Sequence, residues 1–365
     1  MNATHQQLAN HPRMPRVGSK VANRYEIIDL IGEGGFAVVY KAQDTQLGGI
    51  VALKILGPSK SSDTAFTKRF EQEINLVREL HHHNTIKIWD AGETEWGCLY
   101  YAMELVEGEE LTTLIRRTQG LPLNRIIRIV CQVLRSLGEA HRAGIVHRDL
   151  KPGNIMVCQL NDEPDYVKVL DFGIAKARVG LTKVKTQTGV VMCTPNYAAP
   201  ELLRDQTIAP STDLYALGLI MAEMVTGVQA VRADSLVDVI ILQVSSDPVK
   251  LDPSLIDTPI GRIICKATSK SVVERYQCTT EMILDLHSLV PPPTVPISVF
   301  PSGPITPVNI PDWVALQETT HLSSNLVTHA SEPLETKSST TLLILLWLCI
   351  FSFISMAVAI MLQII

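Results

Sequence analysis

The stretch His147-Arg148-Asp149-Leu150-Lys151-Pro152-Gly153-Asn154 places a carboxylate, an ammonium and an amide group in one short segment. Pro152 lacks a backbone N–H and Gly153 relaxes the backbone beside it, so we predict a loop here rather than a helix. A loop can turn all of these polar side chains toward one cavity. Phosphoryl transfer needs such a set: a carboxylate to accept the proton of the attacking hydroxyl, a lysine to meet phosphate charge and an amide oxygen to bind magnesium.

The same stretch resembles the catalytic loop of the protein kinases, whose pattern is H-R-D-L-x-x-x-N. The resemblance implies that Asp149 is the base that orients the substrate hydroxyl, that Lys151 neutralises the transferring phosphate and that Asn154 is a ligand of Mg²⁺. A lysine at the position of Lys151 is typical of serine/threonine kinases, whereas tyrosine kinases usually carry a different sequence there.

Two further motifs bracket the segment that follows this loop. A short apolar strand over residues 167–170 leads into Asp171-Phe172-Gly173, which implies Asp171 as the second Mg²⁺ ligand and a place for Phe172 beneath the helix of Glu73. Further on, Ala199-Pro200-Glu201 matches the A-P-E motif that closes the activation segment of kinases.

Upstream of the loop lies a glycine-rich turn, Gly32-Glu33-Gly34-Gly35-Phe36-Ala37-Val38-Val39-Tyr40, between two β-rich runs. Small residues let backbone N–H groups approach phosphate oxygens, although many hairpins also contain glycines. The kinase pattern G-x-G-x-x-G-x-V matches at Gly32, Gly34 and Val39. Ala37 takes the place of the third glycine, and we expect it to stiffen the turn slightly without abolishing nucleotide binding.

The apolar strand Val51-Ala52-Leu53-Lys54 ends in a lysine, which is either an exposed edge lysine or the strand lysine that binds the α- and β-phosphates of ATP. Glu73 favours the second interpretation, because it borders the apolar stripe of a helix predicted over residues 70–80 and can point toward Lys54. Kinases in the active arrangement carry this ion pair. Glu71 on the same helix is the alternative partner.

The strand over residues 99–103 runs into Glu104, and the resemblance makes this junction the hinge between two lobes. It implies Met103 at the back of the adenine pocket, with backbone groups of Glu104 and Val106 at the adenine edge. The residues implied to bind ATP are Ile31, Gly32, Glu33, Gly34, Gly35, Phe36, Ala37, Val38, Val39, Ala52, Lys54, Glu73, Met103, Glu104, Val106 and Met156.

Between the magnesium motif and A-P-E lie Thr186 and Thr188, our candidates for autophosphorylation, although they could equally be plain loop threonines. Arg148 would pair with a phosphate on this segment. Thr194 and the proline after it match the loop that receives a Ser/Thr substrate, and Cys193 stands where glycine is usual, which restricts that loop.

Other polar residues are expected to support the fold. Asp213 fits the buried helix aspartate that braces the catalytic loop, and Arg275 fits the arginine that pairs with Glu201. The run of histidines at 81–83 suggests a metal site, but no matching ligands are close in sequence, so we expect structural or surface roles there.

Composition limits the remaining function classes. A formal net charge of −5 argues against a general nucleic-acid binder, and seven scattered cysteines without a C-x-x-C pair are typical of reduced thiols in the cytosol. The kinase resemblance covers residues 25–289 and is nearest to the bacterial eukaryotic-like (Hanks-type) serine/threonine kinases. Residues 1–24 are polar and proline-containing, and we expect a disordered segment.

After the domain, residues 290–340 are rich in Pro, Ser and Thr and are expected to be a flexible linker. Residues 341–365 are predicted to be a transmembrane helix, because no charge falls within 342–365. As a helix this run is about 36 Å long, enough to cross a hydrocarbon core of about 30 Å. A buried core helix or an oligomerisation segment is the alternative. We expect a tail anchor that keeps the kinase domain cytoplasmic.

The expected fold is therefore α+β: a two-lobed protein kinase-like fold, with a small β-rich lobe and a large helical lobe, plus one transmembrane helix. The expected function is that of a membrane-anchored serine/threonine protein kinase in signalling, with ATP and Mg²⁺ as cofactors and proteins as substrates. One alternative is a membrane-tethered pseudokinase scaffold, which the retention of Lys54, Asp149, Asn154 and Asp171 disfavours. A kinase of lipids or small molecules is another, and homodimer formation is left open.

Overall fold

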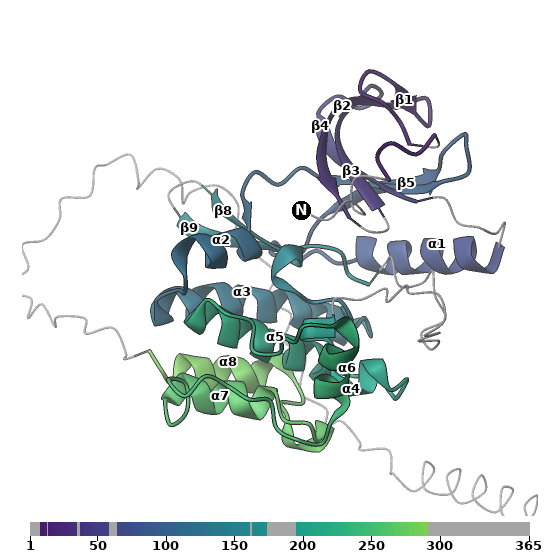
Figure 1. The fold of residues 1–365 in the computed structure, drawn as a ribbon. Helices are drawn as coiled ribbons and strands as arrows, with labels where there is room; N and C mark the ends of the chain where they lie inside the picture. Colours follow the sequence, from purple (N-terminus) through teal and green to yellow (C-terminus); the bar gives the residue numbers. More distant parts are fainter. Residues whose placement is uncertain are drawn as a thin grey trace, which may run out of the picture. The chain divides into compact units, whose positions relative to one another are not determined.

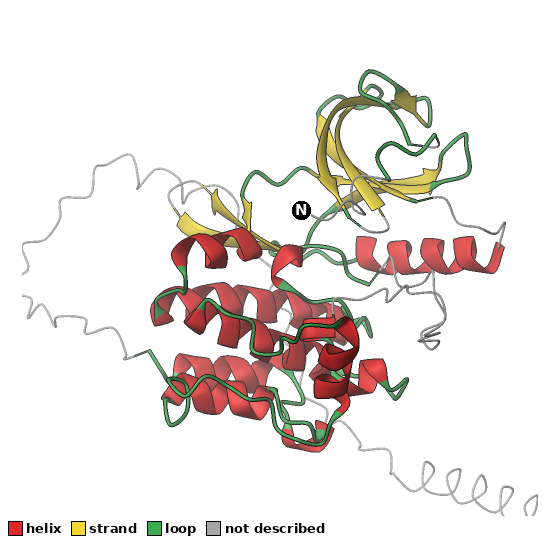
Figure 2. Ribbon diagram, viewed as in Figure 1, coloured by secondary structure: helices red, strands yellow, loops and turns green. Residues whose placement is uncertain are grey.

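The strands of the small lobe come first in the chain and are rich in β-branched and aromatic residues, which favour a pleated, half-buried surface. In the computed structural model, residues 8–12, 14–34, 37–57, 64–160, 163–173 and 195–290 are described. Among these, a six-stranded antiparallel sheet has the order β1-β2-β3-β4-β6-β5 (Figures 1 and 2). Its strands are β1 (Lys20–Val21), β2 (Tyr25–Glu33), β3 (Ala37–Asp44), β4 (Ile50–Leu56), β5 (Ile88–Glu93) and β6 (Leu99–Glu104).

Side chains alternate between the two faces of this sheet, and each face builds a different core. Val38, Leu53 and Tyr100 point to one face, where they form a core within the small lobe. Val39, Lys54 and Tyr101 alternate with them, and the ladder places Lys54 opposite both Val39 and Tyr101. The second face therefore carries the lysine and joins the core that continues into the helical lobe.

The polar N-terminal segment packs on the first face, so the expectation of disorder through residue 24 is wrong for its described part, from Leu8 on. Met14 is buried in the core of the small lobe, and Leu8 and Ala9 pack against it. Their backbone N–H groups both donate to Glu33 Oε1 at 3.1 Å. A few apolar side chains and one carboxylate are enough to hold a segment whose overall composition is polar.

Helix α1 (Thr64–Arg78) follows β4 and packs against β5. Phe66, Phe70, Ile74 and Val77 recur at helical spacing and are all buried, which confirms the helix predicted from this stripe and extends it toward the N-terminus.

The large lobe is mainly helical (Figure 2). Its core is built around α3 and α5, whose apolar faces are almost completely buried. The elements are β7 (Glu109–Glu110), α2 (Leu111–Thr118), α3 (Leu123–Arg142), η1 (Pro152–Asn154), β8 (Ile155–Leu160), β9 (Glu163–Val169), η3 (Pro195–Tyr197), α4 (Pro200–Leu203), α5 (Pro210–Thr226), α6 (Leu236–Val244), α7 (Pro259–Ala267), η4 (Val272–Glu274) and α8 (Thr279–His287). β7, β8 and β9 form a small sheet above α3.

Backbone hydrogen bonds join the two lobes next to β9. Val169 N donates to Asn84 O at 2.8 Å, and Ile86 N donates to Val169 O at 3.0 Å. Asn84 is fully buried and its Nδ2 donates to the carbonyl of Val167. The segment between α1 and β5 is thereby fixed to the strand that leads to Asp171.

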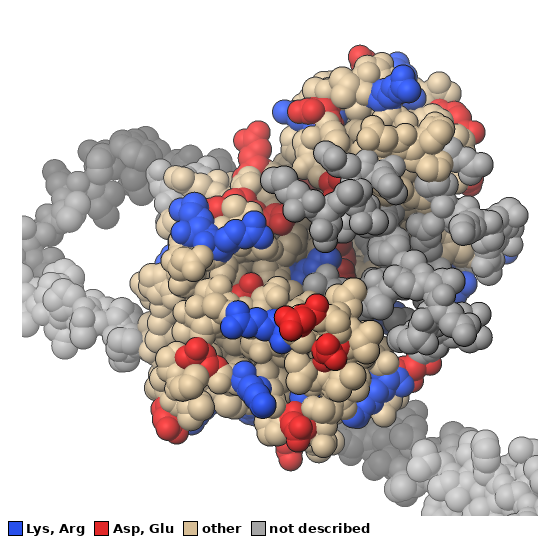
Figure 3. Space-filling model, viewed as in Figure 1, with Lys and Arg blue, Asp and Glu red and all other residues tan. Residues whose placement is uncertain are grey.

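The two-lobed α+β architecture predicted from the sequence is confirmed. The linker and the expected transmembrane helix lie outside the described residues. No helix within the described ranges is both long and apolar enough to span a membrane. On the face in Figure 3, basic and acidic side chains are interspersed over the described part of the helical lobe.

A buried ion pair confirms the expected role of Arg275. Its Nη1 and Nη2 lie 2.8 and 3.0 Å from Oε1 and Oε2 of Glu201, and both side chains are nearly inaccessible to solvent. The pair joins the start of α4 to the loop before α8.

Removing one partner of this pair should destabilise the domain strongly, because the other charge stays buried. We expect Arg275→Met to lower the free energy of unfolding by about 3–5 kcal/mol, measured by urea denaturation. The matched control is Arg117→Met, whose partner Glu109 lies at the surface, so this substitution should change stability little. Equal losses in the two variants would contradict the structural role of Arg275.

Candidate active site

The backbone of the catalytic loop is held by a carboxylate on α5. Asp213 accepts hydrogen bonds from the N–H groups of His147 and Arg148, at 2.8 and 2.9 Å, and its Oδ2 lies 2.7 Å from His141 Nε2. Burial alone would raise the pKa of Asp213, but the hydrogen bonds and charge of His141 and His147 outweigh burial and keep this pKa below its usual range. The predicted bracing role of Asp213 is confirmed.

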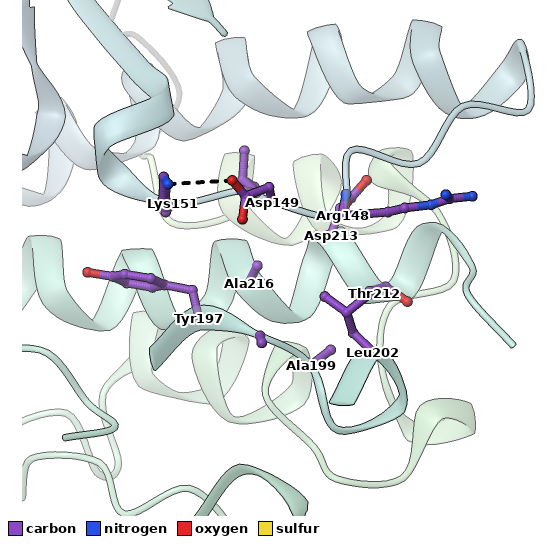
Figure 4. Close-up of a pocket in the computed structure, with 11 residues that line it drawn as sticks. Arg148, Asp149, Lys151, Tyr197, Ala199, Leu202, Thr212, Asp213 and Ala216 are labelled. Atoms are coloured by element: carbon purple, nitrogen blue, oxygen red, sulfur yellow. Dashed lines mark hydrogen bonds and ion pairs between the residues drawn. The ribbon is translucent and has the colours of Figure 1, made fainter. Parts of the chain in front are cut away.

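The predicted catalytic groups lie together on this loop. Lys151 Nζ is 3.4 Å from Asp149 Oδ2, and Asn154 Nδ2 donates to Asp149 O at 2.8 Å. Figure 4 shows Asp149 and Lys151 facing each other, while the Arg148 side chain extends away from them. Both charged side chains are partly accessible, which suits groups that meet a substrate.

A pocket opens beside these groups, between the catalytic loop and the start of α5 (Figure 4). Its other walls come from the segment that precedes α4 and from α4 itself. The lining residues are Arg148, Asp149, Leu150, Lys151, Tyr197, Ala198, Ala199, Leu202, Thr212, Asp213 and Ala216. Asp149 and Lys151 are both among the residues that line it.

Hydrogen bonds hold the wall of this pocket around η3. Gln243 of α6 is fully buried, and its Nε2 donates to the carbonyls of Pro195 and Asn196 at 3.0 and 2.9 Å. Tyr215 OH donates to Gln243 Oε1 at 2.6 Å. Tyr197 OH donates to Glu223 Oε2 at 2.5 Å. The described end of the activation segment, Pro195–Tyr197, is therefore anchored to α5 and α6.

The predicted partner of Lys54 is wrong in this structure. Lys54 Nζ lies 2.5 Å from Asp171 Oδ2 and forms no ion pair with Glu73. Glu73 is half-buried, whereas Glu71 is exposed. Glu73 is therefore the glutamate that faces inward, as predicted. Glu73 Oε2 is buried and accepts no hydrogen bond from the described residues.

The pKa values of Glu73 and Asp171 shift in opposite directions, because only Asp171 has strong partners within the described part of the chain. Burial raises the pKa of Glu73, and the charges of Arg148 and Arg69 oppose this shift only in part. Burial acts in the same direction on Asp171, but the charge and hydrogen bond of Lys54 and the hydrogen bond of Tyr101 keep its pKa below the usual range. The contact with Lys54 is thus the main reason why the Asp171 carboxylate stays ionised despite its burial.

Tyr101 is a site residue that the sequence interpretation missed. Its hydroxyl donates to Asp171 Oδ1 at 2.6 Å. Burial and the neighbouring Asp171 raise the pKa of Tyr101 well above its ordinary value, so the hydroxyl keeps its proton. The sequence did contain a signal. A tyrosine inside a buried strand needs a hydrogen-bond partner, and position 101 is two residues before Met103, so both side chains point to the same face of the sheet.

The sheet register sorts the residues predicted to bind ATP. Ala37, Val39, Ala52 and Met103 belong to the face that carries Lys54. Val38 is fully buried on the opposite face, so its side chain does not face the predicted nucleotide site. Alternation along β3 makes it impossible for neighbouring residues to share a face.

The carboxylate of Glu33 and the N–H of Glu104 are also engaged elsewhere. Glu33 binds the N-terminal segment, as described above. Glu104 N donates to Lys87 O, and its carboxylate lies 2.7 Å from Lys168 Nζ. Glu104 can therefore offer its carbonyl, but not its N–H, to an adenine edge.

The other predicted ATP residues are compatible with the described geometry. Gly32 pairs with Val39 at the end of the β2–β3 ladder, and Ile31 is exposed beside it. Val106 packs against the core beyond the hinge, and Met156 lies half-buried on β8. Gly34 N donates to Ala37 O across the turn, whereas Gly35 and Phe36 lie outside the described residues.

The donor set suits a magnesium ion. Asp171 supplies an ionised carboxylate, and the Asn154 amide donates its N–H to Asp149 O, which leaves Oδ1 as its oxygen donor. Mg²⁺ prefers hard oxygen ligands and usually takes only one or two from protein side chains, with substrate phosphates and water completing the shell. Within the described ranges, no group of three or more His, Cys, Asp or Glu side chains is arranged to hold a metal.

The histidine run has structural contacts. The N–H groups of His81 and His82 both donate to Glu139 at 2.8 Å, and the rings of His82 and His83 stack at 4.3 Å. These contacts join the segment after α1 to α3. Thr186, Thr188, Cys193 and Thr194 lie outside the described residues.

Comparison with known proteins agrees with this geometry. Residues 25–279 match the family profile described as "Protein kinase domain". The chain is 38% identical over 265 residues to the serine/threonine-protein kinase pkn3 of Myxococcus xanthus, covering 71% of this chain and 48% of that protein. It is 36% identical over 282 residues to PknB of Mycobacterium leprae, with 74% and 44% covered. For PknA of Mycobacterium tuberculosis the identity is 39% over 245 residues, with 66% and 56% covered.

These curated relatives are longer proteins, of which this chain spans about half. Among solved structures, the kinase domain of PknI from Mycobacterium tuberculosis superposes with a TM-score of 0.58 at 23% sequence identity. The match covers 76% of this chain and 99% of that structure, which supports the two-lobed fold.

Proposed function

Because the chain belongs to the protein kinase domain family, we propose that it is a serine/threonine protein kinase, transferring the γ-phosphate of ATP to hydroxyl groups of proteins. The observation that carries the proposal is that groups far apart in the sequence meet at one site. Asp149, Lys151 and Asn154 lie on one loop, and Lys54 reaches Asp171 beside it.

In the proposed reaction, the substrate hydroxyl oxygen bonds to the γ-phosphorus and the bond between this phosphorus and the ADP oxygen breaks. Asp149 accepts the hydroxyl proton, and Lys151 offsets charge on the transferring group. Lys54 binds the α- and β-phosphates. Asn154 and Asp171 would hold Mg²⁺, which supplies charge neutralisation at the phosphates when bound.

Two observations favour an active protein kinase over the alternatives. Pseudokinases usually lose the strand lysine, the loop aspartate or the magnesium aspartate, whereas Lys54, Asp149 and Asp171 are all retained here, together with Asn154. The relatives named above are serine/threonine kinases, which supports the same substrate class here.

Asp149 and Lys54 are the residues to test first. We expect Asp149→Asn to reduce phosphate transfer from labelled ATP to a protein substrate by about 10²–10⁴-fold, because no base accepts the hydroxyl proton. Lys54→Met should abolish transfer by weakening phosphate binding. The matched controls Asp234→Asn and Lys250→Met make the same chemical changes at exposed positions and should retain full activity. Parent protein that transfers phosphate to a lipid extract but not to protein would refute the proposal.

We further propose that the kinase phosphorylates its own activation segment at Thr186 or Thr188. Arg148 precedes the catalytic aspartate and carries a charge that a phosphothreonine can pair with. Its charge also acts on Glu73 of α1, where it opposes in part the rise in pKa that burial causes.

The double variant Thr186→Ala/Thr188→Ala should lose the phosphate from this segment, detected by mass spectrometry, and should lose most of its activity toward a separate substrate. Thr182→Ala changes a threonine in the same segment and serves as the control. A double variant with full activity would rule out this mode of activation.

Membrane attachment is proposed from the uncharged run over residues 342–365, with residues 290–340 as a tether and the kinase domain in the cytoplasm. In fractionated cells, the full chain should sediment with membranes and resist carbonate extraction, whereas a chain ending at residue 290 should be soluble. Added protease should not digest the kinase domain in intact cells. A full chain that stays in the soluble fraction would disprove the anchor.

A further inference from the structure

Two groups of the small lobe hold the two oxygens of one aspartate. Lys54 lies on β4 and Tyr101 lies opposite it on β6. Lys54 Nζ is 2.5 Å from Asp171 Oδ2, and Tyr101 OH is 2.6 Å from Asp171 Oδ1. The aspartate itself follows β9 and has a left-handed backbone conformation, with φ of 55°.

These two donors differ in mobility. Tyr101 is 2% exposed and lies on a strand that pairs with β4 on one side and β5 on the other. Its ring packs against Phe70 of α1, with 6.5 Å between centroids. Lys54 has a flexible four-carbon stem and a charge that a phosphate attracts. Tyr101 is therefore the more firmly held of the two donors to Asp171.

A carboxylate has about four lone-pair positions, so a hydrogen bond to Oδ1 does not prevent either oxygen from binding a cation. Hydrogen bonds from neighbouring residues fix the orientation of carboxylates that ligate metals, and losing such a partner typically weakens metal affinity about 10–100-fold. Tyr101 meets this description, because it is a rigid, neutral donor aimed at one oxygen.

We propose that Tyr101 is a positioning residue for magnesium: its hydroxyl orients Asp171 so that this carboxylate can ligate the ion that accompanies ATP. The inference rests on the proposed metal role of Asp171. It assigns a function to a hydroxyl group outside the predicted nucleotide-binding set.

The test compares the full chain with Tyr101→Phe and with Tyr100→Phe. Tyr100 is the neighbouring residue on the same strand, is also buried, and packs on the opposite face against Tyr25 at 5.8 Å. Both substitutions remove one hydroxyl, so Tyr100→Phe controls for the chemical change. The affinity for ADP is measured by calorimetry over a series of Mg²⁺ concentrations, together with phosphate transfer over the same series.

Mg²⁺ should increase the affinity for ADP, and the Mg²⁺ concentration at the midpoint of this increase is the quantity to compare. We expect this concentration to be about 10–100-fold higher for Tyr101→Phe than for the parent, with a parallel shift in activity. The affinity for ADP without Mg²⁺ should be unchanged, which also shows that the variant is folded. Tyr100→Phe should match the parent in its Mg²⁺ requirement. In an Asp171→Asn background, adding Tyr101→Phe should have no further effect, because the group that it orients has been replaced.

Three results would overturn the role of Tyr101 while leaving the metal role of Asp171 intact. The first is a Mg²⁺ requirement of Tyr101→Phe equal to that of the parent. The second is a lower requirement, which would mean that the hydroxyl holds Asp171 away from the metal. The third is an equal loss from Tyr101→Phe with and without Asp171→Asn, which would assign the effect to packing. Parent protein whose ADP affinity does not respond to Mg²⁺ would instead disprove the metal role of Asp171, and this inference with it.

Discussion

The buried carboxylate of Asp213 is the constraint on which the catalytic loop depends. The loop is rich in polar groups, and two of its successive backbone N–H groups would be costly to bury without acceptors. Asp213 accepts both from the interior of α5, which is the most deeply buried helix of the large lobe. The position of Asp149 is therefore determined by the core, although the residue lies in a loop at the surface of a pocket.

A second constraint links the lobes at Asp171. Backbone hydrogen bonds fix β9 to the segment before β5, and the side chains of Lys54 and Tyr101 then hold the aspartate that follows β9. Neither lobe alone contains a complete site. Pairing with Lys54 keeps the pKa of Asp171 below its usual range, whereas burial raises the pKa of Glu73, which has no such contact with the described residues.

The proposed reaction implies an exchange of ionic partners. The phosphates of ATP would take the place of Asp171 as the partner of Lys54, because a triphosphate carries more negative charge than one carboxylate. Asp171 then keeps the hydroxyl of Tyr101, which is fixed by its strand. Lys54 and Tyr101 contact the same side chain but have different proposed roles: the lysine binds phosphate, and the tyrosine orients Asp171.

Short-range patterns in the sequence determined most of the fold and the candidate site residues. Asp149 and Asn154 share a loop and Asp171 follows a strand, as predicted, since Pro, Gly and apolar runs specify these positions locally. Only the tertiary structure decided the partner of Lys54, the face of Val38, the role of Tyr101 and the packing of the segment around Met14. These depend on strand register and on the burial of one carboxylate relative to another, which are set by contacts between distant parts of the chain rather than by neighbours in sequence.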